Sequence, residues 1–113
     1  MGKFFFKTVK IKDKYKVTAT GRVVDRAYSG YTYVLNKATV HYNVYVKVDG
    51  VDGLLTLGVC ENLGYIFKYK LHLYEHWLKV NRDSIVLPVS VGDQITICYN
   101  GKKPKKCNIV EGR

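Results

Sequence analysis

The stretch TVHYNVYVKVDGVDGLLTLGVC, residues 39–60, decides the fold of this chain. Apolar side chains alternate with mostly polar ones in its first half: Tyr42, Val44, Val46 and Val48 against His41, Asn43, Tyr45 and Lys47. A period of two is typical of a strand with one face in water. DGVDG (49–53) favours a turn, because glycine adopts positive φ freely and aspartate is common in turns. We therefore expect a hairpin from 40–48 and 54–60, with Tyr42 in the core and Tyr45 facing solvent.

Further strands are expected on both sides of this hairpin. YKVTATGRVV (15–24) alternates in the same way, and Gly21 within it indicates a bend or a bulge. SIVLPV (84–89), DQITICY (93–99) and the segment beginning CNIV (107–110) read as short β segments, and Tyr99 is in phase with the core. KTVKIK (7–12) predicts an extra strand near the N-terminus. By contrast, AYSGYTYVLNK (27–37) reads as a loop, punctuated by Ser29-Gly30 and Asn36-Lys37.

Residues 61–80 are compatible with two periodicities. With the 100° per residue of a helix, apolar and polar side chains fall on opposite faces. With a period of two, apolar and polar residues alternate from Phe67 to Leu73. The helical pattern explains more positions over a longer span, so we expect a helix over much of 61–80.

The resulting order is a strand, a strand pair, a helix, a strand and a final hairpin. Carried by the stretches 21–59 and 91–112, this order resembles the OB-fold, a five-stranded Greek-key barrel with a helix between its third and fourth strands. The expected fold class is mainly β: a small five- to six-stranded, OB-like Greek-key barrel with one helix around residues 61–80. We expect residues 1–113 to form a single domain, with 1–13 as an extra N-terminal strand or arm.

Charge points to a polyanionic partner. The chain carries 19 Lys+Arg against 9 Asp+Glu, a net charge of +10. YNGKKPKKCNIV (99–110) places four lysines at the tip of the final hairpin. In the OB-like arrangement, this tip, the loop at 26–37 and the outer face of the first two barrel strands would meet at one groove. The candidate nucleic-acid-binding residues are Arg22, Arg26, Tyr28, Tyr31, Tyr33, Lys37, Tyr45, Lys47, Lys102, Lys103, Lys105 and Lys106.

Lysine and arginine neutralise phosphates, and tyrosine rings stack on unpaired bases. The leading hypothesis is non-catalytic binding of single-stranded DNA or RNA with little base specificity. The alternative is a protein-interaction or assembly module with a basic surface, from a virus or mobile element. Phe4–Phe6 would then contact a partner subunit, because three successive phenylalanines cannot all enter one small core. The lysine, valine, isoleucine and tyrosine content also fits a thermophile or its virus.

The sequence offers little support for catalysis. His72 and His76 share a helix face, but there is no HExxH motif and no pair of carboxylates suited to a nuclease. We expect no enzyme, no metal and no cofactor. Three cysteines without a CxxC pair do not indicate a disulfide framework, although Cys98 and Cys107 could bridge the final hairpin. The sequence shows no export signal and no membrane span, which leads us to expect a cytoplasmic location.

Overall fold

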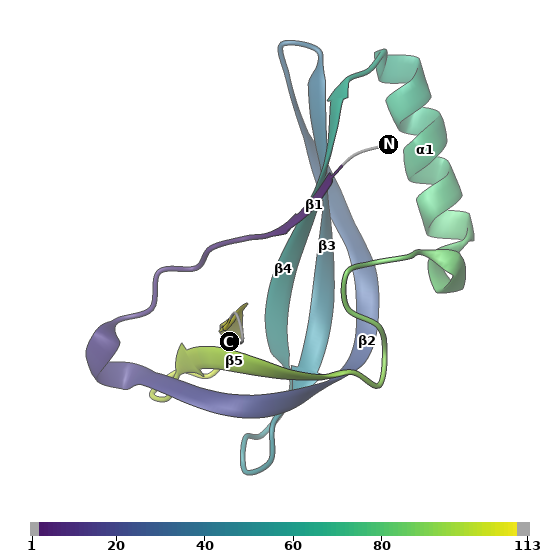
Figure 1. Ribbon diagram of the computed structural model, residues 1–113. Helices are drawn as coiled ribbons and strands as arrows, with labels where there is room; N and C mark the ends of the chain where they lie inside the picture. The colour runs from purple at the N-terminus through teal and green to yellow at the C-terminus, as the bar shows by residue number, and fades with distance from the viewer. Residues whose placement is uncertain (1–2, 111–113) are drawn as a thin grey trace.

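The computed structural model describes residues 3–110, and most of them belong to one sheet (Figure 1). Its strands are β1 (Lys3–Phe6), β2 (Lys16–Val34), β3 (Lys37–Lys47), β4 (Leu55–Tyr65), β5 (Gln94–Asn100) and β6 (Lys106–Ile109). One α-helix, α1 (Lys68–Val80), lies between β4 and β5, and short 3-10 turns precede β2 (η1, Asp13–Tyr15) and follow α1 (η2, Arg82–Ser84). The expected fold class, a small mainly β barrel with one helix in the 61–80 region, is confirmed.

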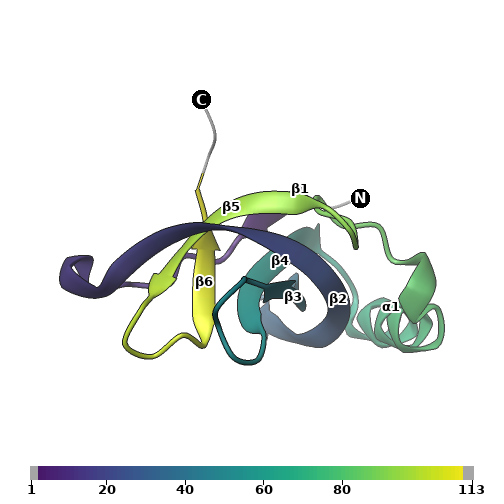
Figure 2. The same ribbon diagram turned by 90° about the horizontal axis from the view of Figure 1, so that it is seen from below.

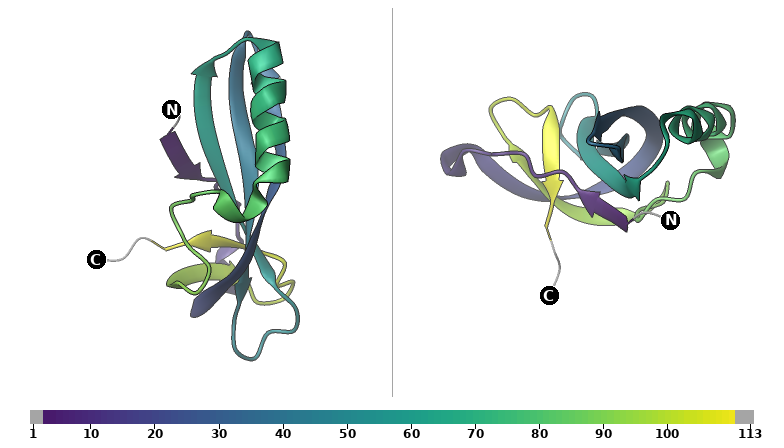
Figure 3. Two further views of the ribbon diagram at one scale, coloured as in Figure 1. Left: turned by 90° about the vertical axis from the view of Figure 1, so that its right-hand side faces the viewer. Right: turned by 90° about the horizontal axis from the view of Figure 1, so that it is seen from above.

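Five of the strands close into a ring. The sheet order is β1-β4-β3-β2-β5-β6, and β6 also pairs with β4 in parallel, through Thr56 with Lys106 and Leu57 with Cys107. β1 adds to the edge of β4 beside this ring (Figure 1). The view from below shows β2 curving from β3 round to β5 (Figure 2). The long hairpin of β2 and β3 extends away from the ring, and α1 runs alongside it (Figure 3).

The core follows the alternation of β3. Every second residue from Ala38 to Val46 is buried, with Tyr42 only 1% exposed, and the residues between them face outward. The hairpin with β4 and the turn at 49–53 form as predicted, with Gly50 and Gly53 both at positive φ. The inner face is therefore the one that carries Tyr42, and the outer face is the one that carries Tyr45.

Gly21 is required by a close approach. A Cβ at this position would lie 2.3 Å from Val46 Cγ1 and 3.2 Å from Val48 Cγ2, so no larger residue fits without moving the neighbouring strand. The bulges of β2 lie further along, where its register against β3 shifts between Val23 and Asp25 and between Tyr28 and Gly30. The expected irregularity in this strand exists, but glycine itself serves packing.

The expected loop at 27–37 is wrong. β2 continues through it to Val34, and only Leu35 and Asn36, both at positive φ, form the turn into β3. The first part of β2 pairs with β5 and the rest with β3, so one 19-residue strand contributes to both sides of the ring. The bulge near Ser29 disturbs the alternation, which is why the segment resembled a loop.

The helix begins later than expected. Residues 61–65 belong to β4, and α1 covers Lys68–Val80, with Leu71 and Leu78 buried against the sheet. The expected strand at 84–89 is absent. Ile85, Leu87 and Val89 are buried and alternate with exposed residues, but the segment pairs with no strand of the sheet.

The N-terminal strand is displaced from its expected position. It covers Lys3–Phe6, whereas 7–12 forms no strand. An N-terminal strand within 1–13 therefore exists, four residues earlier than the KTVKIK pattern predicted.

Candidate functional site

The tyrosines of β2 that were predicted to bind nucleic acid face α1. In the register with β3, Tyr28 lies opposite Tyr42, Tyr31 opposite Val40 and Tyr33 opposite Ala38. Because cross-strand partners point to the same face, all three belong to the inner face. The expectation that they lie in a loop is therefore wrong, because all three belong to β2.

Two of these tyrosines form hydrogen bonds with α1 or with the segment just before it. The Tyr28 hydroxyl donates to Glu75 Oε2 at 2.7 Å, and the Tyr33 hydroxyl donates to the Ile66 carbonyl at 2.9 Å. Burial, together with the Glu75 carboxylate, raises the pKa of Tyr28. The Tyr31 ring lies 6.4 Å from the His72 ring, centroid to centroid. These contacts explain the tyrosines as packing residues.

Arg26 is also occupied within the fold. Its guanidinium donates to the Asp83 carbonyl at 2.9 Å, next to an ion pair of 3.0 Å between Arg82 and Asp25. The Arg26 backbone N–H and the Arg82 guanidinium lower the pKa of Asp25. This small network connects β2 to η2.

The remaining predicted residues, apart from Lys37, gather around one end of the ring. Tyr45 pairs with Thr56, which pairs with Lys106, so the three form one row across β3, β4 and β6. At the usual strand spacing, Tyr45 and Lys106 are about 10 Å apart along this row. Next to Tyr45, Lys47 pairs with Arg22 of β2, and both side chains are exposed.

Arg22 and Lys47 border a shallow hollow. Its volume is about 460 Å³, and it is lined mainly by β2 and β3 residues together with Asp49 and Gln94. The Lys47 ammonium donates to the Val51 carbonyl at 3.0 Å, which fixes it beside the 49–53 turn. Two cations of neighbouring strands are thus available at one hollow.

The lysine loop itself is ordered by local hydrogen bonds. Asn100 Oδ1 accepts from the backbone N–H groups of Lys102 and Lys103, at 2.9 and 3.3 Å. Lys102, Lys103, Lys105 and Lys106 are all exposed. The loop therefore presents its charges to solvent from a fixed backbone.

Tyr15 is a candidate that sequence reasoning missed. The ammonium groups of Lys14 and Lys102 lie 4.8 and 5.3 Å from its ring centroid, and its carbonyl accepts from the Gly101 N–H at 2.7 Å. We call the group formed by Tyr15 and the lysines at 14, 16, 102, 103, 105 and 106 the lysine end. Only the pairing of Lys16 with Asn100 could have revealed it, and that pairing is not visible in the sequence.

Lys37 lies on the outer face, but at the other end of the molecule. It pairs with Tyr65, and its ammonium lies 5.0 Å from that ring's centroid. Thr56 and Tyr65 are separated by nine steps along β4, or about 30 Å. The expected convergence of 26–37 with 102–106 on one groove is therefore wrong. The turn between β2 and β3 and the lysine loop lie at opposite ends of the molecule (Figures 1 and 3).

A cysteine and a histidine meet midway along the outer face. His41 pairs with Cys60, its Nδ1 lies 3.2 Å from the Cys60 Sγ, and its Nε2 lies 2.8 Å from Thr32 Oγ1. Burial raises the pKa of the Cys60 thiol and lowers that of His41, and nearby Lys7 adds to the effect on the histidine. Both shifts favour the neutral thiol and imidazole, which is opposite to what an activated thiolate requires.

The other two cysteines are free thiols inside the final hairpin. Cys98 pairs with Asn108 and Cys107 with Tyr99, so the two side chains point to opposite faces. Burial, with a smaller contribution from Cys98, raises the pKa of Cys107 to about 12. These positions explain the cysteines as core and near-core residues.

Residues 3–110 contain no group of three or more metal-binding side chains and no helix long and apolar enough to cross a membrane. Comparisons with protein-family models, with curated proteins and with solved structures gave no match.

Proposed function

We propose that this protein binds single-stranded nucleic acid, without catalysis, on the outer face of β3 and β4 and across the lysine end. The observation that carries this proposal is the row that places Tyr45 about 10 Å from Lys106, beside Lys47 and Arg22. A partly exposed ring among cations suits a single strand, since phosphates pair with the cations and bases stack on the ring.

We further propose that the chain is an OB-fold domain. The ring order β2-β3-β4-β6-β5 and the helix between β4 and β5 support this assignment. β3 and β4 would be the second and third barrel strands, whose face binds oligonucleotides in this fold, and the lysine loop would be the loop between the fourth and fifth strands.

The outer face is long enough for several nucleotides. Lys37 and Tyr65 lie about 30 Å from the row of Lys106, with Thr39, His41 and Asn43 facing outward between them. In this binding mode Lys37 contacts a distal phosphate, whereas Arg26, Tyr28, Tyr31 and Tyr33 stabilise the fold and do not touch the ligand. Tyr15 joins the set of stacking candidates.

The test is fluorescence anisotropy with labelled oligo-dT over a series of salt concentrations. We expect the logarithm of the association constant to fall linearly with the logarithm of salt. Changing Lys102, Lys103 and Lys105 together to glutamine should flatten that slope by about 2, since each phosphate contact to a single strand contributes about 0.7. Tyr45→Ala should weaken binding about five- to 150-fold, the equivalent of one lost stacking contact.

A matched control separates location from net charge. Changing Lys68, Lys70 and Lys79 to glutamine removes the same three charges from α1, all exposed and outside the proposed site. If both triple variants lose affinity equally, the lysine loop is no binding site and the attraction is non-specific. Absence of binding by the unmodified protein at low salt would refute the proposal altogether.

A second candidate is an assembly module, and a specific observation favours it. α1 exposes an apolar stripe away from the sheet, formed by Tyr69 (62% exposed), Leu73 (65%) and Val80 (66%). Phe4 and Phe6 pack against the core, which leaves Phe5, 47% exposed, as the phenylalanine available to a partner. Large apolar side chains in a row on a solvent-facing helix are typical of a protein contact.

A second copy of this chain is the partner that this candidate predicts. Light scattering coupled to size exclusion should then show a dimer or larger species, and Leu73→Glu should return it to a monomer. A monomer at all concentrations excludes self-assembly through the stripe and leaves the nucleic-acid proposal intact.

A further inference from the structure

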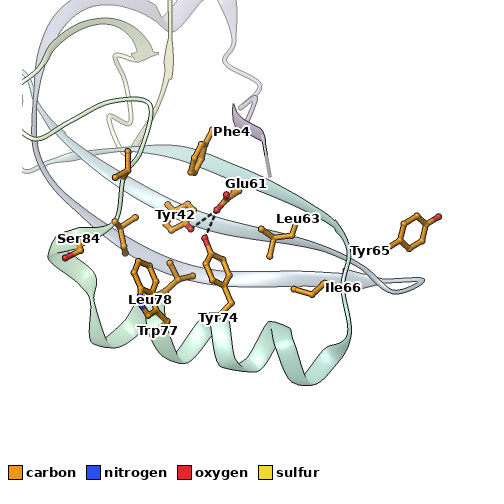
Figure 4. A pocket seen from close by; sticks show the side chains of 12 residues that line it. Phe4, Tyr42, Glu61, Leu63, Tyr65, Ile66, Tyr74, Trp77, Leu78 and Ser84 are labelled. Atoms are coloured by element: carbon orange, nitrogen blue, oxygen red, sulfur yellow. Dashed lines mark hydrogen bonds between the residues drawn. The ribbon is translucent and has the colours of Figure 1, made fainter. Parts of the chain in front are cut away.

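A cavity lies between α1 and the inner face of β3 and β4, away from the outer face (Figure 4). Its volume is about 540 Å³, within the usual range for small-molecule sites, and it is open on one side. Apolar and aromatic side chains form most of its wall, chiefly Phe4, Tyr42, Leu63, Ile66, Tyr74 and Trp77.

One carboxylate is buried in this wall. Glu61 is 4% exposed and is the one charged residue among the buried residues of the described chain. The hydroxyls of Tyr42 and Tyr74 both donate to its Oε1, at 3.2 and 2.9 Å. Figure 4 shows the carboxyl group held between these two rings, from β3 and α1.

The second oxygen of Glu61 has no partner among residues 3–110. No hydrogen bond or ion pair to Oε2 exists there. Every fully buried side-chain oxygen of the described residues does have a hydrogen-bond partner. Oε2 is therefore not sealed in protein and remains reachable from the cavity. A buried carboxylate is costly unless a cation or donors accompany it, and in this chain of net charge +10 no described lysine or arginine does so.

The aromatic rings around the carboxylate complete a site for a cation. Phe4 and Tyr42 lie 6.1 Å apart and Tyr74 and Trp77 stack at 6.3 Å, measured between ring centroids. Ring faces attract ammonium groups, and their edges and the aliphatic side chains accommodate an apolar body. An anionic ligand would meet Glu61 unfavourably, and a purely apolar ligand would leave Oε2 without a partner.

We propose that this cavity binds a small organic monoamine, an ammonium group on an apolar alkyl or aryl body. The ammonium nitrogen pairs with Glu61 Oε2, and the apolar body contacts the cavity wall beside Tyr74 and Trp77. The site is separate from the outer face, so it does not depend on the proposed binding of nucleic acid.

Trp77 is the single tryptophan of the chain, so its fluorescence reports on the cavity. The probes are phenethylamine, the neutral 2-phenylethanol and the anionic hydrocinnamate, which share an aromatic body and differ in the polar group. We expect phenethylamine to bind at least about tenfold more tightly than the alcohol, with no binding of the anion. Raising the salt concentration should leave this preference largely intact, because buried pairs are screened little, whereas binding of oligo-dT should weaken.

Glu61→Gln keeps an acceptor for the tyrosine hydroxyls and removes the charge. It should abolish the preference for the amine and leave binding of the alcohol unchanged. The matched control is Asp52→Asn, which changes the net charge equally on the exposed turn between β3 and β4 and should have no effect.

Two results would overturn the proposal: equal affinity for amine and alcohol in the unmodified protein, or an amine preference that survives in Glu61→Gln. The first comparison needs no variant, so it decides the question even if Glu61→Gln does not fold.

Discussion

The two faces of the β2–β3 hairpin use tyrosine in opposite ways. On the inner face, Tyr28, Tyr33 and Tyr42 have their hydroxyls bonded to groups near or on α1 and β4. On the outer face, Tyr45 lies among cations, and no hydrogen bond of its hydroxyl occurs within residues 3–110. The same residue type in the same hairpin therefore stabilises the fold on one side and remains available for a ligand on the other.

The largest difference between the faces is expected for truncation to alanine. Tyr42→Ala removes a fully buried ring and one donor to Glu61, and should lower the free energy of unfolding by about 3–5 kcal/mol. Tyr45→Ala should lower it by less than about 1 kcal/mol. Urea denaturation followed by circular dichroism measures both, and equal losses would contradict the distinction between the faces.

A smaller effect is expected at Gly21, where the side chains of Val46 and Val48 approach the backbone of β2. Gly21→Ala places a Cβ against Val46 and should cost about 1–3 kcal/mol, because a β-branched side chain in a packed core moves at a cost. The exposed neighbour Thr20 provides the control, since Thr20→Ala should change the free energy of unfolding by about 0.5 kcal/mol or less. A neutral Gly21→Ala would mean that the strands can separate slightly without loss.

The hydrogen bond from Tyr28 to Glu75 should contribute about 1 kcal/mol. Tyr28→Phe removes the hydroxyl and leaves the ring in place. Tyr31→Phe is the matched control, because no described residue hydrogen-bonds to the Tyr31 hydroxyl. Thermal unfolding of the two variants should rank Tyr28→Phe clearly lower, and identical melting curves would show that this hydrogen bond adds nothing to the stability.

The smallest effect concerns pH and a residue of the outer face. Burial, and secondarily Lys7, lowers the pKa of His41 in the folded protein. The unfolded chain therefore takes up a proton below about pH 6.5 that the folded state resists. The stability that depends on a neutral His41 is fully present above that pH, and the free energy of unfolding falls as the pH drops below it.

His41→Gln should reduce this acid sensitivity, and His76→Gln, on the exposed side of α1, should not. Urea titrations at pH 5 and pH 7.5 compare the three proteins. Should His41→Gln behave like the unmodified protein, the Thr32–His41–Cys60 contacts carry no stability.

Periodicity predicted the parts of the fold in which each strand has one buried face. The β3 alternation identified Tyr42 as core and Tyr45 as a residue of the outer face, and the 49–53 turn fixed the hairpin. It failed in β2, because Tyr28 and Tyr31 are three residues apart and yet share a face across a bulge. A period of two cannot register such a position.

The candidate site was predicted only in part, for a similar reason. Lys102, Lys103, Lys105 and Lys106 are recognisable from local charge alone. The place of Tyr15 beside them depends on the pairing of Lys16 with Asn100, 84 positions later in the chain. Glu61 escaped notice because it fell at the start of the expected 61–80 helix, where a single acidic residue indicates an exposed position. Only the converging hydroxyls of Tyr42 and Tyr74 reveal its burial.

The closure of the ring by β6 has a consequence for how the molecule forms and opens. Thr56 and Leu57 meet residues fifty positions later in the chain. During synthesis the barrel therefore stays open until β6 has left the ribosome. In the finished protein, this short parallel seam is where amide hydrogen exchange should first reveal local opening.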